Sequence, residues 1–122
     1  MSGFIGGTSR DFDDGAVVAA GELSIPLSPL PREQVVEGAP SAGAVALGTF
    51  AGQEVGVWEH SPGTSTDVEA DELFIVLSGR ATVFFVEEER TVHLSAGSVM
   101  QLFAGQRTEW TVTETLRKVY VA

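Results

Sequence analysis

The chain has 122 residues, with 7 Lys and Arg against 17 Asp and Glu, which gives a formal net charge of −10 at pH 7. This length predicts one domain, and the acidic surplus argues against nucleic acid or an anionic membrane surface as a partner, because both are bound through clustered cations. No apolar run approaches the roughly 20 residues of a membrane helix, and the N-terminus lacks a signal pattern, so we expect a cytoplasmic protein.

The residue types that are absent narrow the chemistry further. There is no Cys, which removes disulfides, thiolate nucleophiles and thiolate metal ligands together. Lys118 and Tyr120 are the only residues of their types, and His60 and His93 are the only histidines. A catalytic site in this chain therefore has to be built mainly from carboxylates, hydroxyls, Arg and these four side chains.

Residues 1–43 predict an N-terminal arm. Residues 1–15 are rich in Gly and Asp and predict a flexible or loosely docked start. Residues 16–30 are apolar but interrupted by two prolines, which allows an edge strand, and residues 31–36 begin with a proline that suits one short helical turn. No segment keeps a helical spacing of apolar residues over a longer stretch, so we expect little helix.

Residues 44–122 predict a barrel domain made of β-strands. Short β-rich runs alternate with turn residues at intervals of roughly 8–12 residues, a spacing typical of all-β sandwiches and barrels. The runs are 44–50, 54–61, 71–78, 80–87, 91–94, 98–103, 108–113 and 115–121. Residues 72–77 are apolar on both faces of a strand, and both faces must therefore be covered, as in a closed barrel or a sandwich packed on a partner.

Two blocks of this domain resemble the two cupin motifs. Residues 72–83 carry a Glu followed after six residues by a Gly, and residues 97–105 resemble the glycine-bounded second motif. The flanking blocks, residues 56–63 and 114–120, are similar to those of the ethanolamine-utilisation-Q-like branch, also called cupin-3. Cupins are jelly-roll barrels, so the resemblance implies an all-β fold, a single cupin jelly-roll barrel of antiparallel strands with little helix.

The sequence departs from the metal site that the resemblance implies. Metal-binding cupins use three His and one Glu, and only Glu72 remains of that set. The histidine positions hold Thr66 and Val68, or Ser65 and Asp67, in the first motif and Thr108 in the second. Because a transition metal needs three or four converging ligands, we expect no tightly bound metal and no other cofactor. The alternative is a rearranged ligand set that uses His60 or Asp67.

Strand alternation predicts which side chains of residues 72–77 face the barrel interior. If Glu72 points inward, as the resemblance implies, Phe74 and Val76 share its face. The opposite face then carries an outward row of large aliphatic side chains: Leu73, Ile75 and Leu77. An exposed row of this kind needs a cover, which the N-terminal arm or a second subunit would supply, and we expect a homodimer.

The same alternation predicts the residues that bind a ligand. Trp110 shares the inward face of Thr108. In residues 54–61 we place the face of Trp58 and His60 inward, and in residues 115–121 the face of Lys118 and Tyr120, because cupin pockets combine aromatic walls with a few polar groups. Arg107 lies at the barrel mouth by its motif position and can hold an anion. The predicted ligand-binding residues are Trp58, His60, Arg107, Trp110, Lys118 and Tyr120. The alternatives are plain core packing for the two Trp, a strand-end role for His60 and a surface position for Arg107.

These residues lead to one main hypothesis and two alternatives. The main hypothesis is a cupin that holds a small polar or anionic metabolite in its barrel without an obligatory metal. If it is an enzyme, Glu72 is the general acid or base, and Lys118 or Arg107 stabilises the developing negative charge. Glu72 can instead form a structural ion pair with one of these two cations.

The first alternative is a metal-dependent cupin enzyme of the aminohydrolase or dioxygenase type, and the second is a non-catalytic structural or regulatory cupin. A hydrolytic triad has weak support, because sequence alone does not orient either histidine. Whether the protein is an enzyme stays open.

Overall fold

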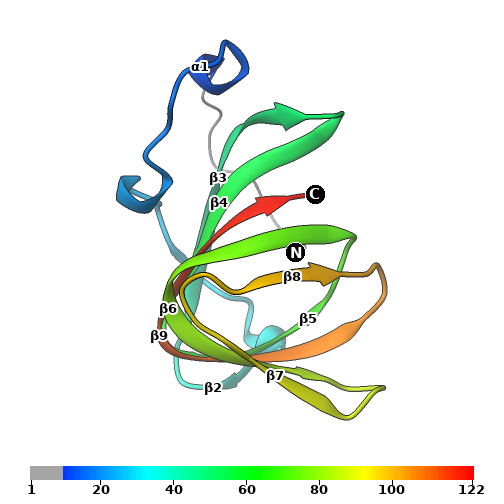
Figure 1. Cartoon of the computed structure of the whole chain (residues 1–122). Helices are drawn as coiled ribbons and strands as arrows, with labels where there is room; N and C mark the ends of the chain where they lie inside the picture. The colour runs from blue at the N-terminus through cyan, green and yellow to red at the C-terminus, as the bar shows by residue number, and fades with distance from the viewer. Residues whose placement is uncertain (1–9) are drawn as a thin grey trace.

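The strand-rich region folds into a curled antiparallel sheet, seen in a computed structural model that describes residues 10–122 (Figure 1). The helical elements are short: α1 (Arg10–Asp13) and the 3-10 turns η1 (Ala20–Glu22) and η2 (Arg32–Gln34). The strands are β1 (Ser28–Pro29), β2 (Val35–Glu37), β3 (Ser41–Phe50), β4 (Gln53–His60), β5 (Gly63–Val68), β6 (Glu72–Phe85), β7 (Arg90–Leu94), β8 (Val99–Leu102) and β9 (Arg107–Val121). This architecture confirms the predicted all-β barrel with little helix.

Two long strands, β6 and β9, form the spine of the barrel. They pair from Leu73 opposite Val121 to Phe85 opposite Thr108. On its other edge β9 pairs with β4 and β5, and β6 pairs with β8 and β7. Each long strand thus pairs with two successive strands along one edge, so β6 and β9 join β4, β5, β7 and β8 into one curled sheet.

The sequence predicted four separate strands where the structure has these two, and that prediction was wrong. Gly79 ends no strand: it lies inside β6 with φ +94°, where the register with β9 shifts. A Cβ at Gly79 would overlap the carbonyl oxygen of Thr115. The glycine therefore allows a bulge and a close backbone approach instead of a turn.

β5 was not among the predicted strands. Its sequence, Gly-Thr-Ser-Thr-Asp-Val, has no apolar alternation, which is the signal that predicts a half-buried strand. Its backbone pairs with β2 on one side and β9 on the other. Tertiary pairing thus makes this polar segment a strand.

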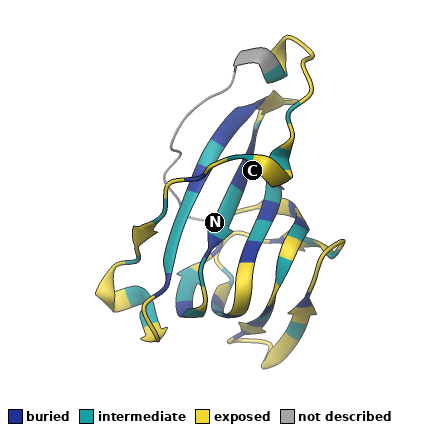
Figure 2. Cartoon of the chain, turned by 90° about the vertical axis from the view of Figure 1, so that its left-hand side faces the viewer, coloured by how far each residue is buried: buried dark blue, intermediate teal, exposed yellow. Residues whose placement is uncertain are grey.

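Alternating side chains of the strands form the core. The predicted inward face is confirmed, because Glu72, Phe74 and Val76 are at most 3 % exposed while Leu73 and Ile75 are 44 % and 42 % exposed. Figure 2 shows this alternation of buried and more exposed positions along the strands. No helix among residues 10–122 combines the length and the hydrophobicity needed to cross a membrane.

The described part of the arm lies along one side of the barrel (Figure 1). It packs on the outer face of β3 and β4 around Ile25, Leu47 and Val57, and Arg117 Nη1 donates a hydrogen bond to the carbonyl oxygen of Ala20 at 3.0 Å. The start of the predicted loosely docked segment, residues 1–9, lies outside the described residues. Within the described arm no contact covers the Leu73 and Ile75 row, which remains exposed.

Candidate functional site

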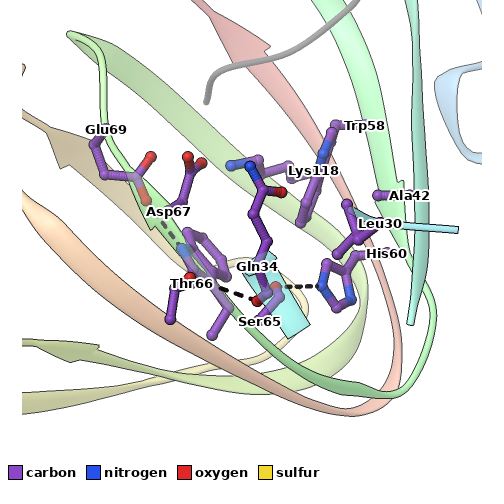
Figure 3. A pocket seen from close by; sticks show the side chains of 11 residues that line it. Leu30, Gln34, Ala42, Trp58, His60, Ser65, Thr66, Asp67, Glu69 and Lys118 are labelled. Atoms are coloured by element: carbon purple, nitrogen blue, oxygen red, sulfur yellow. Dashed lines mark hydrogen bonds between the residues drawn. The ribbon is translucent and has the colours of Figure 1, made fainter. Parts of the chain in front are cut away.

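A cavity is lined by side chains from segments that are far apart in the sequence (Figure 3). Its volume is about 60 Å³, enough for a few water molecules or a small chemical group. The lining residues are Leu30, Gln34, Ala42, Trp58, His60, Ser65, Thr66, Asp67, Glu69, Trp110 and Lys118. A wider groove of about 410 Å³ shares Gln34, Thr66 and Asp67 with the cavity, so the two adjoin each other at these residues.

Lys118 brings a positive charge to the cavity wall. Its Nζ lies 2.7 Å from Glu72 Oε2, and the two side chains are 2 % and 0 % exposed. Three aromatic rings surround the ammonium, with centroids 4.6, 4.3 and 4.7 Å from Nζ for Trp58, Phe74 and Trp110. Removing two charges from water is expensive, and the short ion pair together with the ring faces offsets part of that penalty.

Glu69 brings a second buried carboxylate to the cavity. Its Oε2 accepts hydrogen bonds from Thr108 Oγ1 at 2.6 Å and from Trp110 Nε1 at 2.9 Å. Burial acts to raise the pKa of the Glu69 carboxyl, but the hydrogen bonds from Thr108 and Trp110 are among the contacts that bring it below its ordinary value. Glu69 is therefore an anion at neutral pH.

His60 and Ser65 form a third polar group in the wall. His60 Nε2 lies 2.9 Å from Ser65 Oγ, and His60 Nδ1 lies 2.6 Å from the carbonyl oxygen of Ser61. Burial lowers the pKa of the His60 imidazole, the hydrogen bond to Ser61 opposes this, and the nearby charge of Lys118 lowers it further. The net direction is down, so the imidazole is neutral at pH 7.

The residues present do not fit the metal site of the metal-binding cupins. Glu72, the one family ligand retained, faces the ammonium of Lys118, which supplies the positive charge that a metal ion would bring. Thr108, at the position of the second-motif histidine, donates its hydroxyl hydrogen to Glu69. Across residues 10–122, no group of three or more His, Cys, Asp or Glu is placed to hold a metal ion.

The structure brings four of the six predicted ligand-binding residues together and leaves two outside. Trp58, His60, Trp110 and Lys118 line the cavity. Tyr120 is buried in the core, where its hydroxyl donates to Glu54 Oε2 at 2.7 Å. Burial and this hydrogen bond raise the pKa of the Tyr120 phenol.

Arg107 and Glu72 also lie away from the cavity wall. Arg107 Nη2 pairs with Glu87 Oε2 at 3.0 Å in an exposed salt bridge beside the outer groove. Glu72 is behind Lys118 and reaches the cavity only through the Lys118 ammonium. The structural ion pair that the sequence analysis gave as the alternative role of Glu72 is thus present, and its cation is Lys118.

Several cavity residues were missed as ligand-binding candidates. Ser65 was noted only as the position of a lost histidine, and Asp67 was also named as a ligand of the rearranged metal set. Neither was predicted to bind a metabolite, because β5 itself was not predicted. Glu69 and Gln34 carried no signal, since they reach the cavity from a loop and from η2. Glu69 is placed by backbone hydrogen bonds to the turn before β9, through Gln106 and Gly105, a pairing that no local pattern reveals.

Comparison with known proteins supports the resemblance drawn from the motifs. The family model of the EutQ-like cupin domain matches residues 47–120, and a search among curated proteins found no match. The EutQ protein of Clostridium difficile is similar in structure, with 21 % identity and a TM-score of 0.57 over 67 % of this chain and 61 % of that one.

Two further structures are similar at lower identity. A DUF861-family protein of unknown function from Pseudomonas syringae pv. tomato DC3000 has 20 % identity and a TM-score of 0.67, covering 82 % of this chain and 44 % of that one. Ectoine synthase from P. lautus has 15 % identity and a TM-score of 0.59, covering 76 % of this chain and 66 % of that one. At these identities the structures establish a shared fold.

Proposed function

Because the chain belongs to the EutQ-like cupin family, we propose that its barrel cavity binds a small polar metabolite without requiring a metal ion. One observation carries the proposal: the solvent-open cavity places the Lys118 ammonium, two Trp rings and the Asp67 carboxylate in one wall. Ligand pockets are typically apolar surfaces with a few convergent polar groups, and this wall has that composition.

The charges of the wall favour a metabolite with both an acceptor oxygen and an amino group. Lys118 is neutralised by Glu72, while Asp67 and Glu69 add negative charge to the same lining. A metabolite with both groups can turn its oxygen toward Lys118 and its amino group toward Asp67, whereas a simple carboxylate such as acetate can make only the first of these contacts. In this proposal Glu72 acts as the counter-ion that holds Lys118 in place.

The proposal is tested by thermal shift with three small probes of different charge: acetate, glycine and 2-aminoethanol. Glycine should stabilise the protein most, since a ligand at 100 times its Kd adds about 2.7 kcal/mol, which raises Tm by roughly 10 °C for a domain of this size. Asp67→Asn should remove the preference for glycine over acetate. Equal responses to all three probes, or none up to molar concentrations, would contradict the proposed charge pattern.

Metal independence is tested separately by elemental analysis of protein purified without added metal. We expect far less than one equivalent of Mn, Fe, Ni or Zn per chain, because the residues around Glu72 do not form a ligand set. Near-stoichiometric metal would instead support the metal-dependent alternative.

We also propose a homodimer. The proposal is supported by Leu73 and Ile75, which stay exposed beside Val99, the partner of Ile75 in β8 and 63 % exposed, since an apolar face of this kind marks an interaction surface. Light scattering after size-exclusion chromatography should give twice the mass of the chain for the wild type and a lower mass for Ile75→Glu. A monomeric wild type would end this proposal.

A further inference from the structure

The hydrogen bonds of His60 determine which way its contact with Ser65 runs. A carbonyl oxygen only accepts hydrogen bonds, so His60 Nδ1, at 2.6 Å from Ser61 O, carries the proton. In the neutral imidazole Nε2 is then an acceptor, and the Ser65 hydroxyl donates to it at 2.9 Å. A hydroxyl that donates to an imidazole, with the imidazole held by a third group, is the arrangement that activates a serine nucleophile.

The surroundings of this pair also suit a reaction. His60 and Ser65 are 2 % and 5 % exposed, and both line the cavity, so a group that enters the cavity meets the Ser65 hydroxyl away from bulk water. Lys118 lines the same cavity. The Trp58 ring lies beside both residues, with its centroid 5.4 Å from the centroid of the neutral His60 ring and 4.6 Å from Lys118 Nζ. An ammonium in the lining of the cavity can stabilise the negative charge that develops when a serine attacks a carbonyl.

We propose that Ser65 is a nucleophile, activated by His60 as general base, that accepts a small acyl group from an ester. The acyl group must be about the size of acetyl, because the cavity measures only about 60 Å³, while the alcohol part can lie in the adjoining groove. This reaction uses the cavity of the proposed metabolite site but depends on a different pair of side chains.

Each step of the reaction is balanced by groups on the chain and by water. Ser65 Oγ forms a bond to the ester carbonyl carbon while its proton passes to His60 Nε2, and the carbonyl oxygen takes the electron pair and the negative charge, facing Lys118. The bond to the leaving alcohol oxygen then breaks, and the proton on Nε2 goes to that oxygen. Water repeats the sequence on the acyl-serine, which releases the carboxylic acid and restores Ser65.

The first test is acetylation of the full chain by p-nitrophenyl acetate, followed by peptide mapping. We expect a burst of p-nitrophenolate with the acetyl group on Ser65, no burst for Ser65→Ala, and a rate at least about 100-fold lower for His60→Gln, the usual size of a general-base contribution. Ser78→Ala, at an exposed position of β6, is the control and should react like the wild type. Acetylation only at other residues, or an unchanged burst in Ser65→Ala, would overturn the proposal.

A second test does not depend on the Ala variant folding well. Because the chain has no Cys, S65C introduces a single thiol next to His60, and S78C places one on the surface as a control. His60 should raise the thiolate fraction of S65C, so its alkylation by iodoacetamide at pH 7 should be about tenfold faster than that of S78C, and adding His60→Gln should remove the difference. If S65C is alkylated no faster than S78C, or if adding His60→Gln leaves the rate of S65C unchanged, His60 does not activate position 65.

Discussion

Replacing Lys118 by Met leaves the Glu72 carboxylate in the core without its ammonium. Both side chains are almost fully buried, and the two charged atoms lie 2.7 Å apart. Removing one partner of such a pair costs about 3–5 kcal/mol, a large share of the roughly 5–15 kcal/mol that stabilises a domain. Met keeps most of the contact with the surrounding aromatic rings, so the loss reports mainly on the charge. Replacing Glu72 by Met as well removes the stranded carboxylate and should restore most of the stability.

The assay is urea unfolding of the four variants of this double-mutant cycle, which gives the free energy of unfolding for each. We expect a coupling energy of about 2 kcal/mol or more between Lys118 and Glu72. The matched control is Arg80→Met in the Arg80–Glu114 pair, whose side chains are 68 % and 63 % exposed, and this change should cost below about 1 kcal/mol. Equal losses in the free energy of unfolding for Lys118→Met and Arg80→Met would refute the argument that burial makes the Lys118–Glu72 pair more important for stability than an exposed pair.

Two further predictions concern a titrating group and a backbone position. The pKa of His60 in the folded state lies below its ordinary value of 6.5, so as the pH falls the unfolded chain takes up the proton first. At pH values under 6.5 the free energy of unfolding should therefore decrease, by up to about 1.4 kcal/mol for each pH unit. Chemical denaturation between pH 7.5 and 5 should lose this slope in His60→Gln and keep it in His93→Gln, an exposed position; identical slopes in both would contradict the assignment. Gly79→Ala should cost about 2 kcal/mol or more, because the added Cβ meets the Thr115 carbonyl at a positive φ. Gly21→Ala, with open space around it, should change the free energy by less than about 0.5 kcal/mol, and similar values for both glycines would refute the steric argument.

Strand alternation predicted the faces of β6 because the side-chain period of a strand is two and the hydrophobic pattern is strong there. The same rule failed on β5, whose polar sequence carries no pattern although the strand contributes Ser65 and Asp67 to the cavity. It also placed Tyr120 with Lys118 on one inward face, correctly as to burial. Of these two residues only Lys118 lines the cavity. Tyr120 lies two residues further along β9, where its ring packs against Gly56.

By itself the sequence determined the fold class, the family resemblance, the loss of the histidine ligands and the choice of Glu72 as the central carboxylate, with Lys118 or Arg107 as its cation. These conclusions depend on residue types and short-range spacing, which local chemistry sets. The tertiary structure alone decided that Lys118 pairs with Glu72, that Glu69 meets Thr108 and that Ser65 donates to His60. The physical reason is that most of these contacts join different strands or a strand and a loop, and the register and closure of the sheet are a property of the whole barrel.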